Sequence, residues 1–216
     1  MYKILSDYQE IYNRYPADAF LNKARRKARH SEIMKWTKQE YPTMPTITEI
    51  AKFMRSNDTL KYEQPFFLKV VTPCVIKDLG EGRIESLRFL FECNGMDSHR
   101  IGTSTDYVHM FNMGVAYQYE TWDLADMVLS HEPDNQVVMY YKYISLRRFL
   151  DYSTHEAPSF ILSGNNGAEK EDMPYLNKNL RDFTTLSKKL GKNDEHFVKE
   201  CYELYNAWEH SLGLRS

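Results

Sequence analysis

The chain has 216 residues, of which 42% are hydrophobic and 27% charged, and its formal net charge is −2. This composition is typical of a globular protein and excludes an intrinsically disordered one, while the length suits one sizeable domain or two small ones. No apolar run approaches the roughly 20 residues that span a bilayer, and the N-terminus lacks the apolar core of a signal peptide. Cys74, Cys93 and Cys201 are too few and too widely spaced for a disulfide framework or a zinc motif. We therefore expect a reducing, cytoplasmic setting, with no metal and no other cofactor.

The charge is unevenly distributed along the chain. Residues 1–62 carry 12 Lys and Arg against 7 Asp and Glu, whereas residues 63–216 carry 16 against 23. Much of the surplus lies in the run Lys23–Arg29, with the sequence KARRKAR. A basic stretch of this kind is typical of phosphate contact, although a solvated helix face gives the same pattern. Any contact with an acidic partner is therefore expected in the N-terminal segment.

Two helices are predicted in that segment. Pro16 can occupy the first turn of a helix over residues 17–39, which the prolines of the following segment end. Thr46 and Glu49 then form a capping box, in which the side chain of each residue binds a backbone N–H of the other. This box predicts a short second helix that ends near Ser56.

The segment that begins with Pro45-Thr46 and continues Glu49-Ile50-Ala51-Lys52 resembles the second helix of a winged helix-turn-helix, a fold of many bacterial repressors. The order of a long helix, a short helix and an extended ribbon is similar as well. The resemblance implies DNA binding, with residues 57–64 as the recognition helix. That segment has Lys61 as its one basic residue and is followed by Pro65, and the ribbon beyond it is strongly apolar. An ordinary capped helix is therefore the favoured interpretation of residues 46–54.

From Phe66 onward the pattern changes to one typical of strands. Residues 66–71 and 74–76 are rich in β-formers, and hydrophobic residues alternate over 87–93 and 107–119. A short helix over residues 122–129 and a strand over residues 137–144 follow. The pattern predicts a mainly antiparallel sheet that occupies most of residues 63–150.

The C-terminal part is predicted to be helical again. Residues 151–173 contain Gly, Asn and acidic clusters typical of a linker or loop. Two amphipathic stretches separated by Gly191 then predict an αα-hairpin. The predicted fold is α+β, with a basic helical segment (1–62), an antiparallel β core (63–150), a linker (151–173) and a C-terminal αα-hairpin (174–216).

The primary functional hypothesis is a non-enzymatic intracellular binding or regulatory protein. It would contact nucleic acid or an acidic protein surface through its basic N-terminal helices. The candidate contact residues are Lys23, Arg25, Arg26, Lys27, Arg29, Lys52, Arg55 and Lys61.

Two alternatives remain open. One is a structural or assembly subunit that docks on other proteins or on itself, and the residue usage favours a phage or viral origin, hence a host cytoplasm. The tyrosines at positions 117, 119, 140, 141 and 143 have three interpretations: pairs in the core, a patch that docks on a protein partner, or a surface that stacks bases. The other alternative is a hydrolase or metal-dependent nuclease that uses His99, Asp106 and His109, with Asp123 and Asp126 nearby in sequence.

Overall fold

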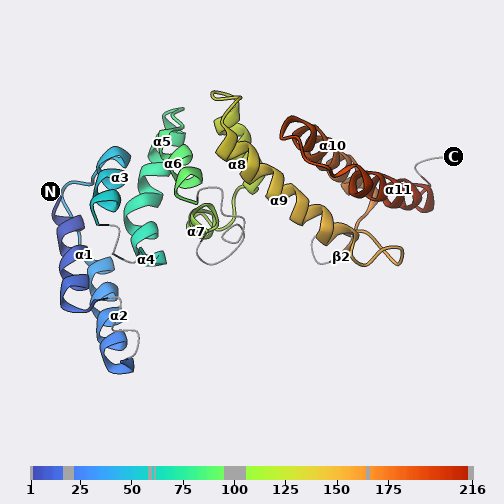
Figure 1. Ribbon diagram of the computed structural model, residues 1–216. Coiled ribbons are helices and arrows are strands. Elements are labelled where there is room, and N and C mark those ends of the chain that lie inside the picture. Colours follow the sequence, from blue (N-terminus) through green and yellow to red (C-terminus); the bar gives the residue numbers. More distant parts are fainter. Residues whose placement is uncertain are drawn as a thin grey trace. The chain divides into compact units, whose positions relative to one another are not determined.

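A computed structural model describes residues 2–16, 22–57, 60, 62–94, 106–163 and 166–213. These residues form two compact units: the first comprises the described residues up to Asn94 together with 106–119, and the second those from Glu120 onward. Both units are built of helices (Figure 1). Within these described ranges, no helix combines the length and the apolar character needed to cross a membrane.

The first unit contains the helices of the N-terminal half. They are α1 (Lys3–Arg14), α2 (Lys23–Lys38), α3 (Ile47–Ser56), α4 (Gln64–Phe66), the π-helix η2 (Phe67–Val71), α5 (Thr72–Gly80), α6 (Glu85–Asn94) and α7 (Tyr107–Gly114). In Figure 1, α1 and α2 lie side by side, in agreement with the contacts between them.

The core of the first unit is aromatic. The ring of Tyr8 in α1 lies 5.0 Å from that of Trp36 in α2 and 4.8 Å from that of Phe66 in α4, measured between centroids. All three side chains are fully buried. The Trp36 indole N–H also donates a hydrogen bond to the carbonyl of Ile4, at 3.1 Å. These contacts fix α2 against α1 and α4.

The second unit contains the remaining elements. They are α8 (Thr121–Leu129), α9 (Gln136–Thr154), β1 (Leu162–Ser163), β2 (Asn166–Gly167), the 3-10 helix η3 (Lys170–Asp172), α10 (Met173–Lys189) and α11 (Glu195–Ser211). The two short strands pair antiparallel, with Leu162 opposite Gly167. Helix α9 packs against both α8 and α10.

Asp194, just before α11, joins the C-terminal helices to α9. Its carboxylate accepts hydrogen bonds from the Tyr143 hydroxyl (2.8 Å), the Arg147 guanidinium (3.0 Å) and the Ser187 hydroxyl (2.7 Å). Burial, followed by this contact with Asp194, raises the pKa of Tyr143 to about 12. The hairpin turn is therefore held by side chains of both α9 and α10.

The predicted central sheet, and with it the α+β fold, is wrong. Residues 64–80 form one continuous helix, since α4, η2 and α5 follow one another without a break. The buried hydrophobic residues are Phe66, Phe67, Val70, Val71 and Val75. Their spacing of three to four residues places them on one side of a helix. Packing of that side overrode the weak preference of these residue types for strands.

The other predicted strands are helices as well. Residues 87–93 lie in α6, which buries Leu87, Leu90 and Phe91. Residues 107–119 form α7 and a following turn. Val108 and Met110, which lie between the alternating hydrophobic residues, are also buried, so the alternation does not indicate a strand. Residues 137–144 belong to the 19-residue helix α9. A continuous apolar run is equally consistent with a buried helix.

Several local predictions are confirmed. The Thr46–Glu49 capping box begins α3, which ends at Ser56. The helix predicted over 122–129 is α8. The two C-terminal helices are α10 and α11, which lie side by side in Figure 1. Gly191 between them has the left-handed φ of 63° that glycine adopts readily.

Candidate functional site

Helix α2 carries most of the predicted contact residues. It begins at Lys23, later than predicted, because the side chain of Asn22 accepts hydrogen bonds from the N–H groups of Ala24 (3.0 Å) and Arg25 (3.2 Å). The helix contains seven Lys and Arg residues against one acidic residue, Glu32. Its first turn has no acidic residue, so positive side chains surround the positive end of the helix dipole.

Arg29 is the exception among these cations, since it points into the first unit. It is 3% exposed. Its guanidinium donates to the Glu63 carboxylate (3.3 Å) and to the Pro16 carbonyl (3.2 Å), and lies 5.1 Å from the centre of the Tyr12 ring. Tyr12 donates to the same Glu63 oxygen. Arg29 therefore holds α2 against α1 and α4. The sequence predicts it as a contact residue for a partner, whereas its contacts here are structural.

The side of α2 that faces away from the core of the first unit carries a row of lysines. Helix geometry places Lys23, Lys27 and Lys38 within about 60° of one another around the axis, away from the buried residues Arg29, Ile33 and Trp36. The described residues provide an ion-pair partner for Lys35, namely Glu32, but none for these three lysines. We call Lys23, Lys27 and Lys38 the basic face of α2. Arg26 is exposed beside it, about 60° from Lys23 around the axis, whereas Arg25 is exposed about 140° or more from all three lysines.

Lys38 is the member of this face that the sequence analysis missed. It lies outside the compact run Lys23–Arg29, at the other end of the helix. Projection of the sequence on a helical wheel over residues 23–38 would have placed it with Lys23 and Lys27.

Lys69 of η2 fixes the C-terminal end of α2. Its ammonium donates to the carbonyls of Thr37 (2.8 Å) and Gln39 (2.6 Å) and lies over the rings of Trp36 and Tyr41. A cation at this position satisfies carbonyls that have no partner within the helix. Burial lowers the pKa of this lysine. Lys69 therefore belongs to the internal structure of the unit.

The remaining basic candidates lie on or near α3. Lys52 and Arg55 are exposed on this helix. Lys52 lines an open groove of about 370 Å³ together with Tyr2, Glu49, Phe53, Ser56 and Asn57. Lys61 lies outside the described residues.

The helix-turn-helix resemblance does not extend to a recognition helix among the described residues. After α3 ends at Ser56, the next helix is α4, which begins at Gln64. Pro65 lies in the first turn of α4, so it begins that helix and does not end an earlier one. The prediction that an ordinary capped helix occupies residues 46–54 fits this arrangement.

The candidate catalytic residues are only partly brought together. His99 lies outside the described residues. Asp106 is 1% exposed, and its carboxylate caps α7 by accepting from the N–H groups of Val108 (2.9 Å) and His109 (3.1 Å). His109 is half-buried, with its ring centre 5.7 Å from that of Tyr117. A carboxylate that accepts two backbone hydrogen bonds is already used in stabilising the helix.

The acidic and aromatic candidates of the second unit are mostly structural. Asp126 accepts a hydrogen bond from the buried ammonium of Lys142, at 2.6 Å, and Asp123 is exposed. Tyr141 and Tyr143 are buried in α9. Across the part of the chain that the structure describes, no cluster of three or more His, Cys, Asp or Glu side chains could hold a metal ion.

No protein-family model matches the chain, and no curated protein or solved structure is similar to it. The residues and their geometry are therefore the basis for a functional proposal.

Proposed function

We propose that this chain is a non-enzymatic binding protein that contacts an acidic partner, either nucleic acid or an acidic protein surface, through the basic face of α2. The observation that carries the proposal is the row of exposed lysines without ion-pair partners among the described residues. Such a row attracts polyanions over a distance set by the ionic strength. The three cysteines are free thiols, which favours a reducing cytoplasm as its location.

The arrangement of α2 supports a binding role over a purely solvated helix. Its inner side is fixed from Arg29 onward by Arg29, Ile33 and Trp36, so the part of the helix that carries Lys38 has a rigid support. A solvated helix gains stability from acidic residues in its first turn, and α2 has basic ones there instead. The charge pattern therefore opposes helix stability and fits an anionic partner.

Retention on a heparin column tests this proposal. Lys23/Lys27/Lys38→Ala should elute at lower salt than the wild type. The matched control is Lys170/Lys188/Lys199→Ala, which removes three exposed lysines of the second unit and gives the same net charge. Equal elution of the two variants, or no retention of the wild type, would contradict the proposal.

A second candidate function is docking in a protein assembly. Leu68 (38% exposed), Met113 (40%) and Tyr117 (59%) are exposed apolar side chains of η2, α7 and the turn after it. Gly114 brings η2 and α7 close together, since a Cβ on it would lie 2.8 Å from the Leu68 side chain. Exposed apolar groups at one junction favour protein contact. A strictly monomeric protein in light scattering, with no co-purifying partner, would argue against this candidate.

A further inference from the structure

The basic face of α2 lacks the large aromatic side chains that anchor many protein interfaces. Interfaces between proteins have an apolar or aromatic centre and are depleted in lysine. The one large hydrophobic side chain exposed on α2 is Met34, at 41%. The indole of Trp36 is 1% exposed and points inward, and the other aromatic ring of the helix, the imidazole of His30, is exposed. An acidic protein surface would find three lysines and the partly exposed Met34 here, but no Tyr, Trp or Phe as an anchor.

The same composition disfavours single-stranded nucleic acid. Proteins that bind single strands stack successive bases on exposed aromatic rings. Because Trp36 is buried, the imidazole of His30 is the one aromatic ring that α2 exposes, and a single ring cannot stack successive bases. A duplex, whose bases are already stacked on one another, needs only cations along its phosphates.

The dimensions of the basic face suit a duplex. Lys23 and Lys38 are 15 residues apart, which corresponds to about 22 Å along a helix. Over that length, B-form DNA presents about 13 phosphates, so three lysines can each reach one. The wide major groove of B-form DNA lets the lysines of a helix above it reach the phosphates that line it, whereas the major groove of duplex RNA is deep and narrow.

We infer that the partner of the basic face of α2 is the phosphate backbone of duplex DNA, bound without regard to sequence. This inference rests on the proposed function and names its partner. Lysine contacts to phosphate carry no sequence information. In the described residues after α3, no further helix precedes α4, whose Phe66 is buried in the core. An element that could read base edges next to α3 is therefore lacking among those residues.

The test is a fluorescence-anisotropy titration with two duplexes of unrelated sequence, a single strand, a duplex RNA and poly-glutamate. Both DNA duplexes should bind with equal affinity. Three phosphate contacts correspond to a log–log salt slope of about −2.7, so the affinity should fall about 40-fold between 50 and 200 mM salt. Lys23→Ala alone should reduce the slope by about one contact, and Lys170/Lys188/Lys199→Ala should leave it unchanged.

The outcomes separate this inference from the proposed function. Tighter binding of poly-glutamate, the single strand or duplex RNA than of duplex DNA would overturn the inference and leave an acidic partner in place. A difference of tenfold or more between the two duplexes would also overturn it. Absence of binding to every probe at 50 mM salt would overturn both. Circular dichroism of each variant confirms that a loss of binding is not a loss of fold.

Discussion

Two arginines of the same basic run have opposite surroundings. Arg25 is exposed in the first turn of α2, whereas Arg29, four residues later, is buried and ion-paired with Glu63. Arg25 and Arg29 lie about 40° apart, on the same side of α2, and they differ because that side is covered only from about Arg29 onward. The run looks uniform in the sequence, because nothing in it shows where along the helix this cover begins. The contact residues could therefore be predicted as a group, but not divided into surface and structural members.

Replacement of Arg25 by glutamate should separate stability from binding. Position 25 is the third residue of α2 after the cap, where a carboxylate can complete a capping box with Asn22 and also interact favourably with the helix dipole. We expect Arg25→Glu to raise the free energy of unfolding by about 0.3–1 kcal/mol and to weaken duplex DNA binding. Urea denaturation and the anisotropy titration measure the two effects.

Arg25→Gln is the matched control, because it removes the positive charge without adding a negative one. Its stability and affinity should both lie between those of the wild type and Arg25→Glu. A Glu variant that is less stable than the wild type would show that Arg25 contributes to the fold.

At the level of elements, the sequence predicts best what is decided locally. The α3 capping box involves two residues three positions apart, so Thr46 and Glu49 predict its start correctly. Within the helix over residues 64–80, residues 66–71 and 74–76 are predicted as strands, because Phe and Val suit both structures and the ring partners of Phe66, Tyr8 and Trp36, come from distant segments. Burial at helical spacing, visible only after packing, decides between the two.

Replacement of Gly114 by alanine tests how closely α7 approaches η2. An alanine in a helix is normally more stable than glycine by about 1 kcal/mol. Here its Cβ would lie 2.8 Å from Leu68 Cδ2 and 3.2 Å from Thr72 Cγ2, so one of these side chains must move. We expect Gly114→Ala to give no gain in thermal stability.

The double variant Leu68→Ala/Gly114→Ala provides the control. Because Leu68 is 38% exposed, its truncation costs little, and it removes the closer of the two contacts while the 3.2 Å contact with Thr72 Cγ2 remains. Gly114→Ala should therefore stabilise the Leu68→Ala background, although it does not stabilise the wild type. An equal effect in both backgrounds would contradict the clash.

At the scale of the molecule, each unit has its own core and its own charge. The described residues of the first unit carry 15 Lys and Arg against 11 Asp and Glu, and those of the second carry 10 against 16. The contrast between a basic N-terminal part and an acidic remainder could be predicted from the sequence, because it requires only a count of charged residues. The helical architecture of the middle of the chain could not, because it depends on packing.

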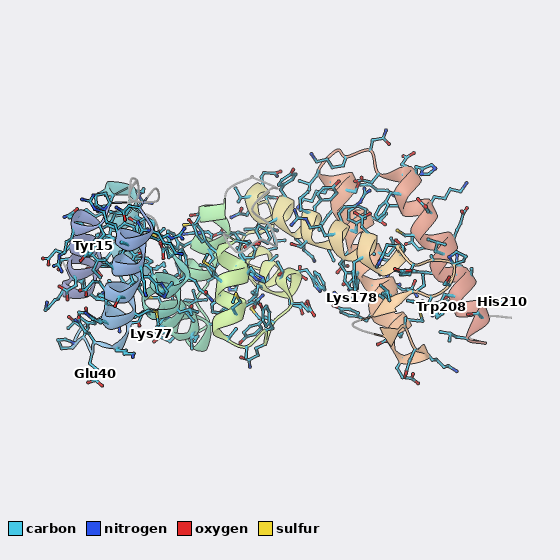
Figure 2. All side chains as sticks on the ribbon, turned by 90° about the horizontal axis from the view of Figure 1, so that it is seen from below. Tyr15, Glu40, Lys77, Lys178, Trp208 and His210 are labelled. Atoms are coloured by element: carbon cyan, nitrogen blue, oxygen red, sulfur yellow. The ribbon has the colours of Figure 1, made fainter. Side chains whose placement is uncertain are left out.

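The three tryptophans report on the two units separately. Trp36 lies in the first unit and Trp122 in the second, which also contains Trp208, labelled in Figure 2. Leu90→Ala in the core of the first unit should cost about 2–5 kcal/mol. In a Trp122→Phe/Trp208→Phe background it should lower the urea midpoint of the Trp36 signal. In a Trp36→Phe background it should leave the signal of the other two unchanged.

Leu180→Ala, in the core of the second unit, should give the reverse pattern. Equal shifts of both signals by either variant would show that the chain unfolds as one cooperative body.

The contacts of α2 are concentrated toward its C-terminal end, and this has a consequence for its motion. Arg29, Ile33 and Trp36 are buried and Lys69 binds the last carbonyls, whereas residues 22–27 are all exposed and the Asn22 cap holds the first turn. The helix is thus fixed at one end only. Amide hydrogens near Arg26 should exchange with solvent far faster than those near Trp36. The end that carries Lys23 and Lys27 can therefore change its angle to fit a partner without disturbing the aromatic core.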